Sequence, residues 1–402
     1  MSDLNLLYSD IEEALRASLR DLLAAEASFG ALLSRIETAE PYDLKLWHTL
    51  AADLGLAGLL VPESLGGQGA SVREVAVVME ELGRAVAPVP FLGSAVLATA
   101  ALLAAGDQEL LPRLASGELV AAPAIPLTTA PGAAVIETAF RAVHADGTAA
   151  KGAGPDGTLT GAPTHALTGT VRSVADAPAA DVLLVPATGP SGPGLYAVEH
   201  SHASVTEFTP LDLTRRLGGV TLSGAPARLI AGEGQPGEGR LAVQAVRAAV
   251  TAAAGLLASE QAGLAQWCLD ETVAYLRQRY QFGRPLGSFQ ALKHRLADLY
   301  TEVVSARAAA RAAADALASG TLASASNDAA IAVGVAQCTC SAVAVHAAEE
   351  AVQLHGGIGM TWEHPAQLRL KRAKSDELAL GTPGRHRALL ADLVNLPSAP
   401  HA

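Results

Sequence analysis

Apolar side chains recur at helical spacing near the start of the chain. Residues 72–86 give the clearest pattern, with apolar side chains three or four positions apart at Val75, Val78, Met79 and Leu82. This spacing places them on one face of a helix, and Pro88 and Pro90 end it because proline cannot continue a helix. Another helix is expected to open at Ser9, and a short one to cover Glu109–Leu114. Residues 1–118 are therefore predicted to form a helical domain.

The pattern changes between residues 119 and 232, where glycine, proline and threonine become frequent. Short apolar runs rich in β-branched residues stand between turn signals, at Ala133–Ile136, Val182–Val185, Leu195–Val198 and Val220–Leu222. Such runs are typical of strands, and their short connections favour antiparallel pairing. This part is predicted to be an antiparallel β domain, either barrel-like or sandwich-like.

Long alanine-rich helices follow a glycine-rich linker at Gly232–Gly239. Their apolar patterns cover about Leu241–Arg279, Ser288–Ser319 and Ala323–Leu354. Short connections between long amphipathic helices are typical of a four-helix bundle, which is predicted for residues 233–402. The resulting fold class is α+β, with domains at 1–118, 119–232 and 233–402.

Composition excludes several classes of protein. Charged residues make up 17% and hydrophobic residues 50% of the 402 positions, so the chain is not of the disordered type. The net charge of −12 and the lack of a long basic run argue against a nucleic-acid or anionic-membrane partner. The N-terminus has no signal-peptide pattern, so a cytoplasmic location is expected. The apolar stretch Ile331–Ala348 is interrupted by polar residues, which favours a buried helix over a membrane span.

The three cysteines do not suggest a metal centre. Cys338 and Cys340 are two positions apart and point in different directions on a helix, and Cys268 is far away in sequence. With no second ligand pair, we predict no metal site and interpret the cysteines as small buried residues.

The segment Arg279–Gln290, RYQFGRPLGSFQ, carries the strongest chemical signal. An arginine offers a planar fork to phosphate oxygens, and Phe282 offers a ring face. Gly283 and Pro285 are expected to stop the preceding helix and turn the backbone outward. This combination suits a ligand with a diphosphate and a flat heterocycle.

The same segment resembles the flavin-contacting Arg-x-x-Phe-Gly stretch of acyl-CoA dehydrogenases. Residues Gln353–Pro365 resemble the Gln-x-x-Gly-Gly-x-Gly segment of that family, and Leu54–Gly69 is similar to its first-domain signature. The resemblance implies a helical, then β, then four-helix-bundle order of domains. It also implies FAD as cofactor and α,β-dehydrogenation of an acyl-CoA thioester as the reaction.

In this family, each flavin is held by two subunits. One subunit reaches across to the diphosphate and adenosine, and the resemblance assigns that role here to Arg279, Gln281, Phe282, Gly283, Phe289, Gln290, Gln353, Gly356 and Gly357. The segments that wrap the flavin ring depart from the family pattern. Pro126–Ala133 lacks the expected carboxylate, and Ser173–Ala175 stands where the family has a Trp-x-Thr run, without its aromatic side chain or its hydroxyl donor at the last position.

The family's catalytic glutamate is also missing. Leu380 stands at the usual position of this base, and Ala253 stands at the position used by some relatives. Neither side chain accepts a proton. Glu377 and Glu260 are possible substitutes, although each is equally interpretable as a solvated or ion-paired surface glutamate. His355 and His294 are interpreted as polar helix positions rather than catalytic groups.

The leading hypothesis is therefore a base-less subunit of a heteromeric acyl-CoA dehydrogenase. It would share FAD with a homologous partner that carries the base, in an α2β2 assembly. The segments LGSFQALKH and GGIGMTWEHP resemble those of actinobacterial enzymes that act on bulky, steroid-like CoA thioesters. Two alternatives stay open: a self-sufficient homomeric dehydrogenase that uses Glu377 or Glu260 as base, and a non-catalytic scaffold subunit.

Overall fold

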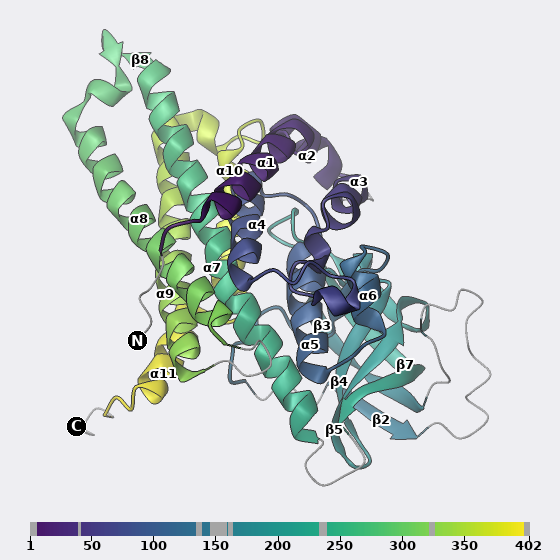
Figure 1. The fold of residues 1–402 in the computed structure, drawn as a ribbon. Coiled ribbons are helices and arrows are strands. Elements are labelled where there is room, and N and C mark those ends of the chain that lie inside the picture. Colours follow the sequence, from purple (N-terminus) through teal and green to yellow (C-terminus); the bar gives the residue numbers. More distant parts are fainter. Residues whose placement is uncertain are drawn as a thin grey trace, which may run out of the picture.

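A computed structural model of the chain describes residues 6–38, 42–133, 139–144, 159, 164–232, 239–320 and 326–397. Helices come first, strands occupy the middle and long helices end the chain (Figure 1). This is the α+β order predicted from the sequence.

The N-terminal region is helical, as predicted. Its helices are α1 (Asp10–Glu26), α2 (Phe29–Ile36), α3 (Leu44–His48), α4 (Val72–Ala85), α5 (Thr99–Ala105) and α6 (Leu110–Ala115). Ser9 caps α1 in a capping box with Glu12, which confirms the predicted start. The apolar residues predicted to share one face of α4 are all buried. The sequence reading missed α2, α3, α5 and the π-helical segment Phe91–Ala98, because apolar residues cover most of the last two and leave no periodicity to read.

The central strands close into a barrel. They are β1 (Ala121–Pro123), β2 (Phe140–His144), β3 (His165–Ala175), β4 (Val182–Gly189), β5 (Gly192–Glu199), β6 (Ser204–Phe208) and β7 (Leu217–Gly232). The path β4-β2-β3-β7-β5 returns to β4 because β4 also pairs with β5. Large side chains such as Phe140 and Tyr196 fill its interior core.

The predicted strands within β4, β5 and β7 are confirmed, whereas purely antiparallel pairing is wrong. Strand β4 pairs in parallel with β1 along its first residues and with β2 at a single position, Arg141 opposite Thr188. Parallel strands need a crossover connection, and here other strands of the same sheet lie between the paired strands in sequence. The predicted strand Ala133–Ile136 lies, except for Ala133, outside the described residues.

The C-terminal region is a bundle of long helices, as predicted. Its helices are α7 (Gly239–Gln278), α8 (Gln290–Ala318), α9 (Asn327–His355), α10 (Ala366–Leu378) and α11 (Pro383–Leu393). Helices α7 to α10 pack together, and the shorter α11 packs on α9. The linker expected at Gly232–Gly239 and the expected start of the third helix at Ala323 fall largely outside the described residues.

Helix α7 joins the three regions. It packs against α4 and α5, against β5 and β7, and against α8 and α9 (Figure 1). Two glycines allow its closest crossing with α4: a Cβ on Gly83 would lie 2.1 Å from the Glu260 carbonyl oxygen, and one on Gly263 would lie 1.9 Å from that of Glu80. The backbones of the two helices therefore touch, and one apolar core runs from the N-terminal helices into the bundle.

Within the described residues, α7 and the segment Asn327–Met360 are long and apolar enough to cross a membrane by length and composition. Their apolar windows are 72% and 56% buried inside the protein. Buried core helices of soluble proteins show the same composition.

Candidate functional site

The flavin-type motif forms a projecting hairpin between α7 and α8. Its strands are β8 (Tyr280–Gln281) and β9 (Arg284–Pro285). The turn residues Phe282 and Gly283 have φ values of 54° and 76°, and positive φ at both positions is the requirement of a type I′ turn. A positive φ is rare for phenylalanine. Phe282 adopts it at a position that is 87% exposed. Figure 1 shows the hairpin extending beyond the body of the bundle.

Local contacts fix the shape of this hairpin. The Phe282 ring meets the edge of Phe289 at a centroid distance of 6.2 Å, and the Arg284 guanidinium lies 3.8 Å from the Phe289 ring centre. Gln290 bonds to exposed His294 at 2.8 Å. Arg279 and Gln281 are exposed, and Arg279 forms no ion pair with any described residue. The predicted binding residues here are thus ordered but directed away from their own chain.

The second motif lies at the C-terminal end of α9. Gln353, Gly356 and Gly357 are exposed, and a Cβ on either glycine would have no described neighbour within 4 Å. The hydroxyl group of Tyr275 donates to the His355 carbonyl at 3.3 Å, which joins the end of α7 to the end of α9. Because Tyr275 is one turn before Arg279, this contact brings both motifs to the same end of the bundle.

The exposed residues of the hairpin and of the segment after α9 fit the nucleotide half of a flavin dinucleotide. An unpaired guanidinium suits a diphosphate, exposed amides suit polar base edges, and glycines without neighbours admit close approach to a backbone. The hairpin contacts α7 through β9, and it lies at the opposite end of the molecule from the β domain (Figure 1). A group bound here would therefore lie far from the β domain of its own chain.

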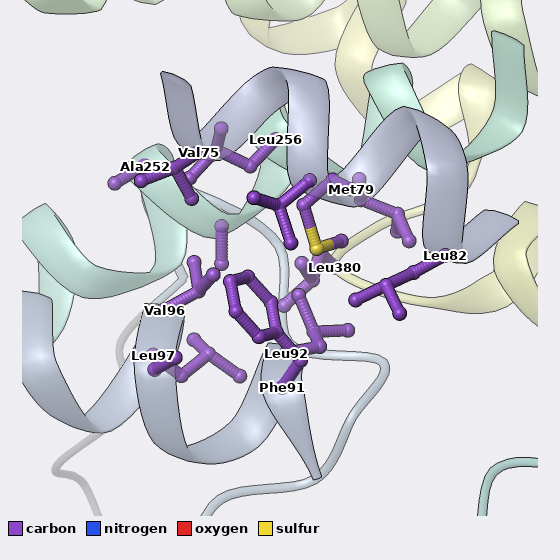
Figure 2. Packing of buried hydrophobic residues seen from close by; sticks show 14 of the residues in the cluster. Val75, Met79, Leu82, Phe91, Leu92, Val96, Leu97, Ala252, Leu256 and Leu380 are labelled. Atoms are coloured by element: carbon purple, nitrogen blue, oxygen red, sulfur yellow. The ribbon is translucent and has the colours of Figure 1, made fainter. Parts of the chain in front are cut away.

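Leu380, at the expected base position, is fully buried. Its backbone has φ 54°, and its N–H donates to the Leu127 carbonyl at 2.7 Å. The side chain lies in an apolar cluster that includes Val75, Met79 and Phe91 (Figure 2). Ala253, at the alternative base position, is also fully buried in this core. The core occupies both places where a catalytic carboxylate would stand.

The segments expected to wrap a flavin ring are in direct contact with each other. A Cβ on Gly381 would lie 2.7 Å from the Cβ of Ala130, in addition to the Leu380–Leu127 hydrogen bond. His386 Nε2 lies 3.0 Å from the Leu380 carbonyl, and burial lowers the pKa of this imidazole. These residues do not fit a ring and a thioester between them, and they offer no proton acceptor at Leu380.

Glu260 is buried, so the interpretation as a surface glutamate is wrong for this residue. It belongs to a buried ion cluster consisting of Asp212, Arg215, Glu260, Arg372 and Asp376. Arg215 Nη2 lies 2.7 Å from both Glu260 oxygens, and Arg372 Nη1 lies 2.5 Å from Oε1. Burial favours protonation of Glu260, but the two arginines outweigh it and hold its pKa below the ordinary value. A carboxylate bound in this way is a poor proton acceptor.

The buried ion cluster ties the β domain to the bundle. Arg372 Nε donates to Asp212 Oδ2 at 2.5 Å, and Arg215 pairs with Asp376. Its two arginines face three carboxylates, and Asp376 Oδ2 has no hydrogen-bond partner among the described residues. Burial and the nearby Glu260 raise the pKa of Asp376 well above its ordinary value. Asp212 and Arg215 lie in one turn, and the sequence alone did not reveal Arg372 and Asp376 as their partners.

Glu377 stands near the end of α10 with a side chain that is 34% exposed, 3.6 Å from Lys374. His355 is buried, and its Nδ1 lies 2.6 Å from the Ala351 carbonyl. Among the described residues, Glu271, His355 and His364 each bring one possible ligand atom within 4.8 Å of the others. No sequence pattern indicated this group, and the absence of a metal site stays a prediction.

The chain matches the descriptions "Acyl-CoA dehydrogenase, N-terminal domain" over residues 9–118 and "Acyl-CoA dehydrogenase, C-terminal domain" over residues 243–394. It is 35% identical over 375 residues to "Acyl-CoA dehydrogenase IpdE2" of Mycolicibacterium smegmatis, covering 93% of this chain and 96% of that protein. The chain belongs to the acyl-CoA dehydrogenase family. The Mycobacterium tuberculosis IpdE2 is 34% identical, covering 92% of this chain and 93% of that protein.

Solved structures of the acyl-CoA dehydrogenase family share the fold. The ChsE4-ChsE5 complex from Mycobacterium tuberculosis has a TM-score of 0.79 at 28% identity, covering 98% of this chain and 100% of that chain. A variant of the Tcur3481-Tcur3483 steroid ACAD has a TM-score of 0.76 at 28% identity, covering 96% of this chain and 98% of that chain. Both structures are named for two different proteins.

Proposed function

We propose that this chain is the base-less subunit of a heteromeric, flavin-dependent acyl-CoA dehydrogenase that acts on a steroid-type thioester. The burial of Leu380 in an apolar core carries the proposal, because the position of the base can neither accept a proton nor admit a substrate. The similar structure named as a steroid ACAD supports the substrate class, and the two similar structures named for two proteins support the heteromer.

In this proposal, the chain contributes to a site completed by a homologous partner. Arg279 binds the diphosphate, Phe282 covers a flat part of the nucleotide, and Gln353 binds its polar edge. The exposed hairpin and the unobstructed glycines after α9 support these roles. The bound FAD supplies the hydride acceptor, and the partner supplies the ring-binding surface and the base. An α2β2 assembly lets each of two base-carrying chains receive one such hairpin.

Co-expression with candidate partners tests the proposal. The chain purified alone is expected to hold much less than one flavin per chain and to show no dehydrogenase activity. A complex with its partner is expected to hold one flavin per pair of chains. Stoichiometric flavin and full activity in the lone chain would overturn the proposal, whereas a complex that keeps its flavin when Arg279 is replaced would identify a scaffold subunit.

A further inference from the structure

A cavity of about 330 Å³ lies between α1, α2, α4, α7 and α10. Its apolar wall consists of Leu23, Ala27, Phe29, Ala85 and Trp267 together with Ala24. Its charged wall consists of Arg20, Glu81, Arg84 and Arg369. None of these residues belongs to the exposed hairpin, to the motif after α9 or to the surroundings of Leu380. The cavity is therefore separate from the proposed flavin site.

All but one of the charges around this cavity are compensated. Glu81 accepts from Arg16 Nε at 3.1 Å and from Arg20 Nε at 3.0 Å. Arg84 pairs with Asp270 at 2.8 Å. Arg369 has no carboxylate within ion-pair distance among the described residues. Three arginines and one glutamate line the cavity, so its wall is positively charged although the whole chain carries −12.

Arg369 is only 6% exposed, so its missing partner is costly. Its guanidinium donates only to the backbone carbonyls of Pro365 at 3.4 Å and Arg84 at 3.1 Å, and its Nε has no partner in the described part of the chain. Burial lowers its pKa to about 10, which leaves the group charged at neutral pH. The guanidinium also lies 3.9 Å from the Trp267 ring centre, so an aromatic wall adjoins the unpaired charge. A buried charge without a counter-ion strongly disfavours the folded state.

We propose that this cavity binds a small monocarboxylate with an apolar body, and that its carboxylate pairs with Arg369. The guanidinium fork matches a carboxylate in geometry and charge. Glu81 on the same wall disfavours a dianion such as phosphate. Trp267, Phe29 and Leu23 would cover the apolar body, and the volume lies at the small end of ligand pockets.

Octanoate and the uncharged octanamide are a matched pair of probes for the purified full-length protein. Octanoate is expected to bind saturably by calorimetry, to raise the melting temperature and to change the fluorescence contributed by Trp267. Octanamide is expected to bind at least roughly tenfold more weakly, because it lacks the charge that Arg369 requires. The two probes binding alike, or octanoate not binding saturably, would overturn the proposal.

Substitution of Arg369 provides a second test of the proposal. In the ligand-free protein, Arg369→Met is expected to raise the melting temperature, because it removes an uncompensated buried charge, and to weaken octanoate binding at least about tenfold. Lys371→Met removes a charge from the same helix outside the cavity and is expected to leave octanoate binding unchanged. If Arg369→Met lowered the melting temperature of the assembled protein and left octanoate binding intact, Arg369 would be paired by a partner chain and the proposal would be wrong.

Discussion

The backbone N–H of Leu380 donates a 2.7 Å hydrogen bond to the carbonyl of Leu127. This bond joins the segment that carries the catalytic glutamate in relatives to the loop that should help wrap the flavin ring. With the Leu380 side chain in the core on the other side, the position has become structural. Leu380 is therefore held both through its backbone and through its buried side chain.

Restoring the glutamate is not expected to restore activity. Leu380→Glu should destabilise the chain by about 3 kcal/mol or more, because it places a carboxylate without a partner in an apolar core. Urea unfolding at pH 5 and pH 8 checks this, and the loss should be smaller at pH 5, where the carboxyl is more readily protonated. The control Leu380→Met should cost less than about 1.5 kcal/mol. Dehydrogenase activity in the lone Leu380→Glu chain would contradict the structural role.

The hairpin arginine should matter for flavin and not for folding. Arg279→Ala is expected to change the stability of the lone chain by less than about 0.5 kcal/mol, because the side chain is exposed and forms no described ion pair. In the complex, it should weaken FAD binding by about 2 kcal/mol, or roughly thirtyfold. Arg277→Ala, two residues earlier and also exposed, is the matched control. Equal flavin content in both variants would argue against the assigned role.

The buried ion cluster should give the protein a pH-dependent stability. The raised pKa of Asp376 means that the folded state keeps a proton that the unfolded state has released. Stability from this group is present below the ordinary carboxyl pKa and is lost as the pH rises toward the raised value, by up to about 1.4 kcal/mol per pH unit. Asp376→Asn should remove this loss. The stability of the variant relative to the wild-type protein should therefore be higher at pH 8 than at pH 5. Unfolding curves at several pH values measure the slope.

The pH dependence of stability that Glu260 contributes has the opposite sign. Its lowered pKa contributes stability above the ordinary glutamate pKa, and that contribution is lost as the pH falls through the lowered value. Glu260→Gln leaves Arg215 and Arg372 with an unneutralised buried charge and should cost about 3–5 kcal/mol at neutral pH. If Glu260→Gln kept the stability of the protein and abolished only the turnover of an active complex, Glu260 would again be a candidate base.

The contact between α4 and α7 should tolerate no added methyl group. Gly263→Ala would place a Cβ 1.9 Å from the Glu80 carbonyl oxygen, so the two helices must move apart. We expect a loss of about 1–3 kcal/mol, the usual range for overpacking. Gly320→Ala is the control, because its Cβ would have no described neighbour within 4 Å. Thermal unfolding of both variants distinguishes a steric effect from a general effect of removing glycine.

The periodic parts of the fold could be predicted from the sequence, and the uniformly apolar parts could not. Helix α4 follows from the spacing of Val75, Met79 and Leu82, whereas the segment Phe91–Ala98 is fully buried and has no polar face to reveal its period. The parallel pairing of β1 with β4 depends on chain segments far apart in sequence, which local patterns do not describe.

The residues of the candidate site likewise divide into those that the sequence revealed and those that it did not. The hairpin residues could be singled out from the sequence because their chemistry is concentrated in one short motif, and their role in FAD binding stays a prediction. The buried ion cluster unites residues as distant as Asp212 and Asp376, and the unpaired charge of Arg369 is visible only once its surroundings are known. Assignment of Glu260 as a surface residue failed because the two arginines that allow its burial lie on other elements.

The exposed hairpin has a consequence for the life of this chain before assembly. Arg279 is exposed and lies between the end of α7 and the two-residue turn of the hairpin, which has few contacts with the rest of the bundle. Trypsin-like proteases prefer such sites, and one cut there would separate α7 from α8 while both stayed folded. In the proposed heteromer, a copy of this chain without its partner would therefore be cut first at this exposed point.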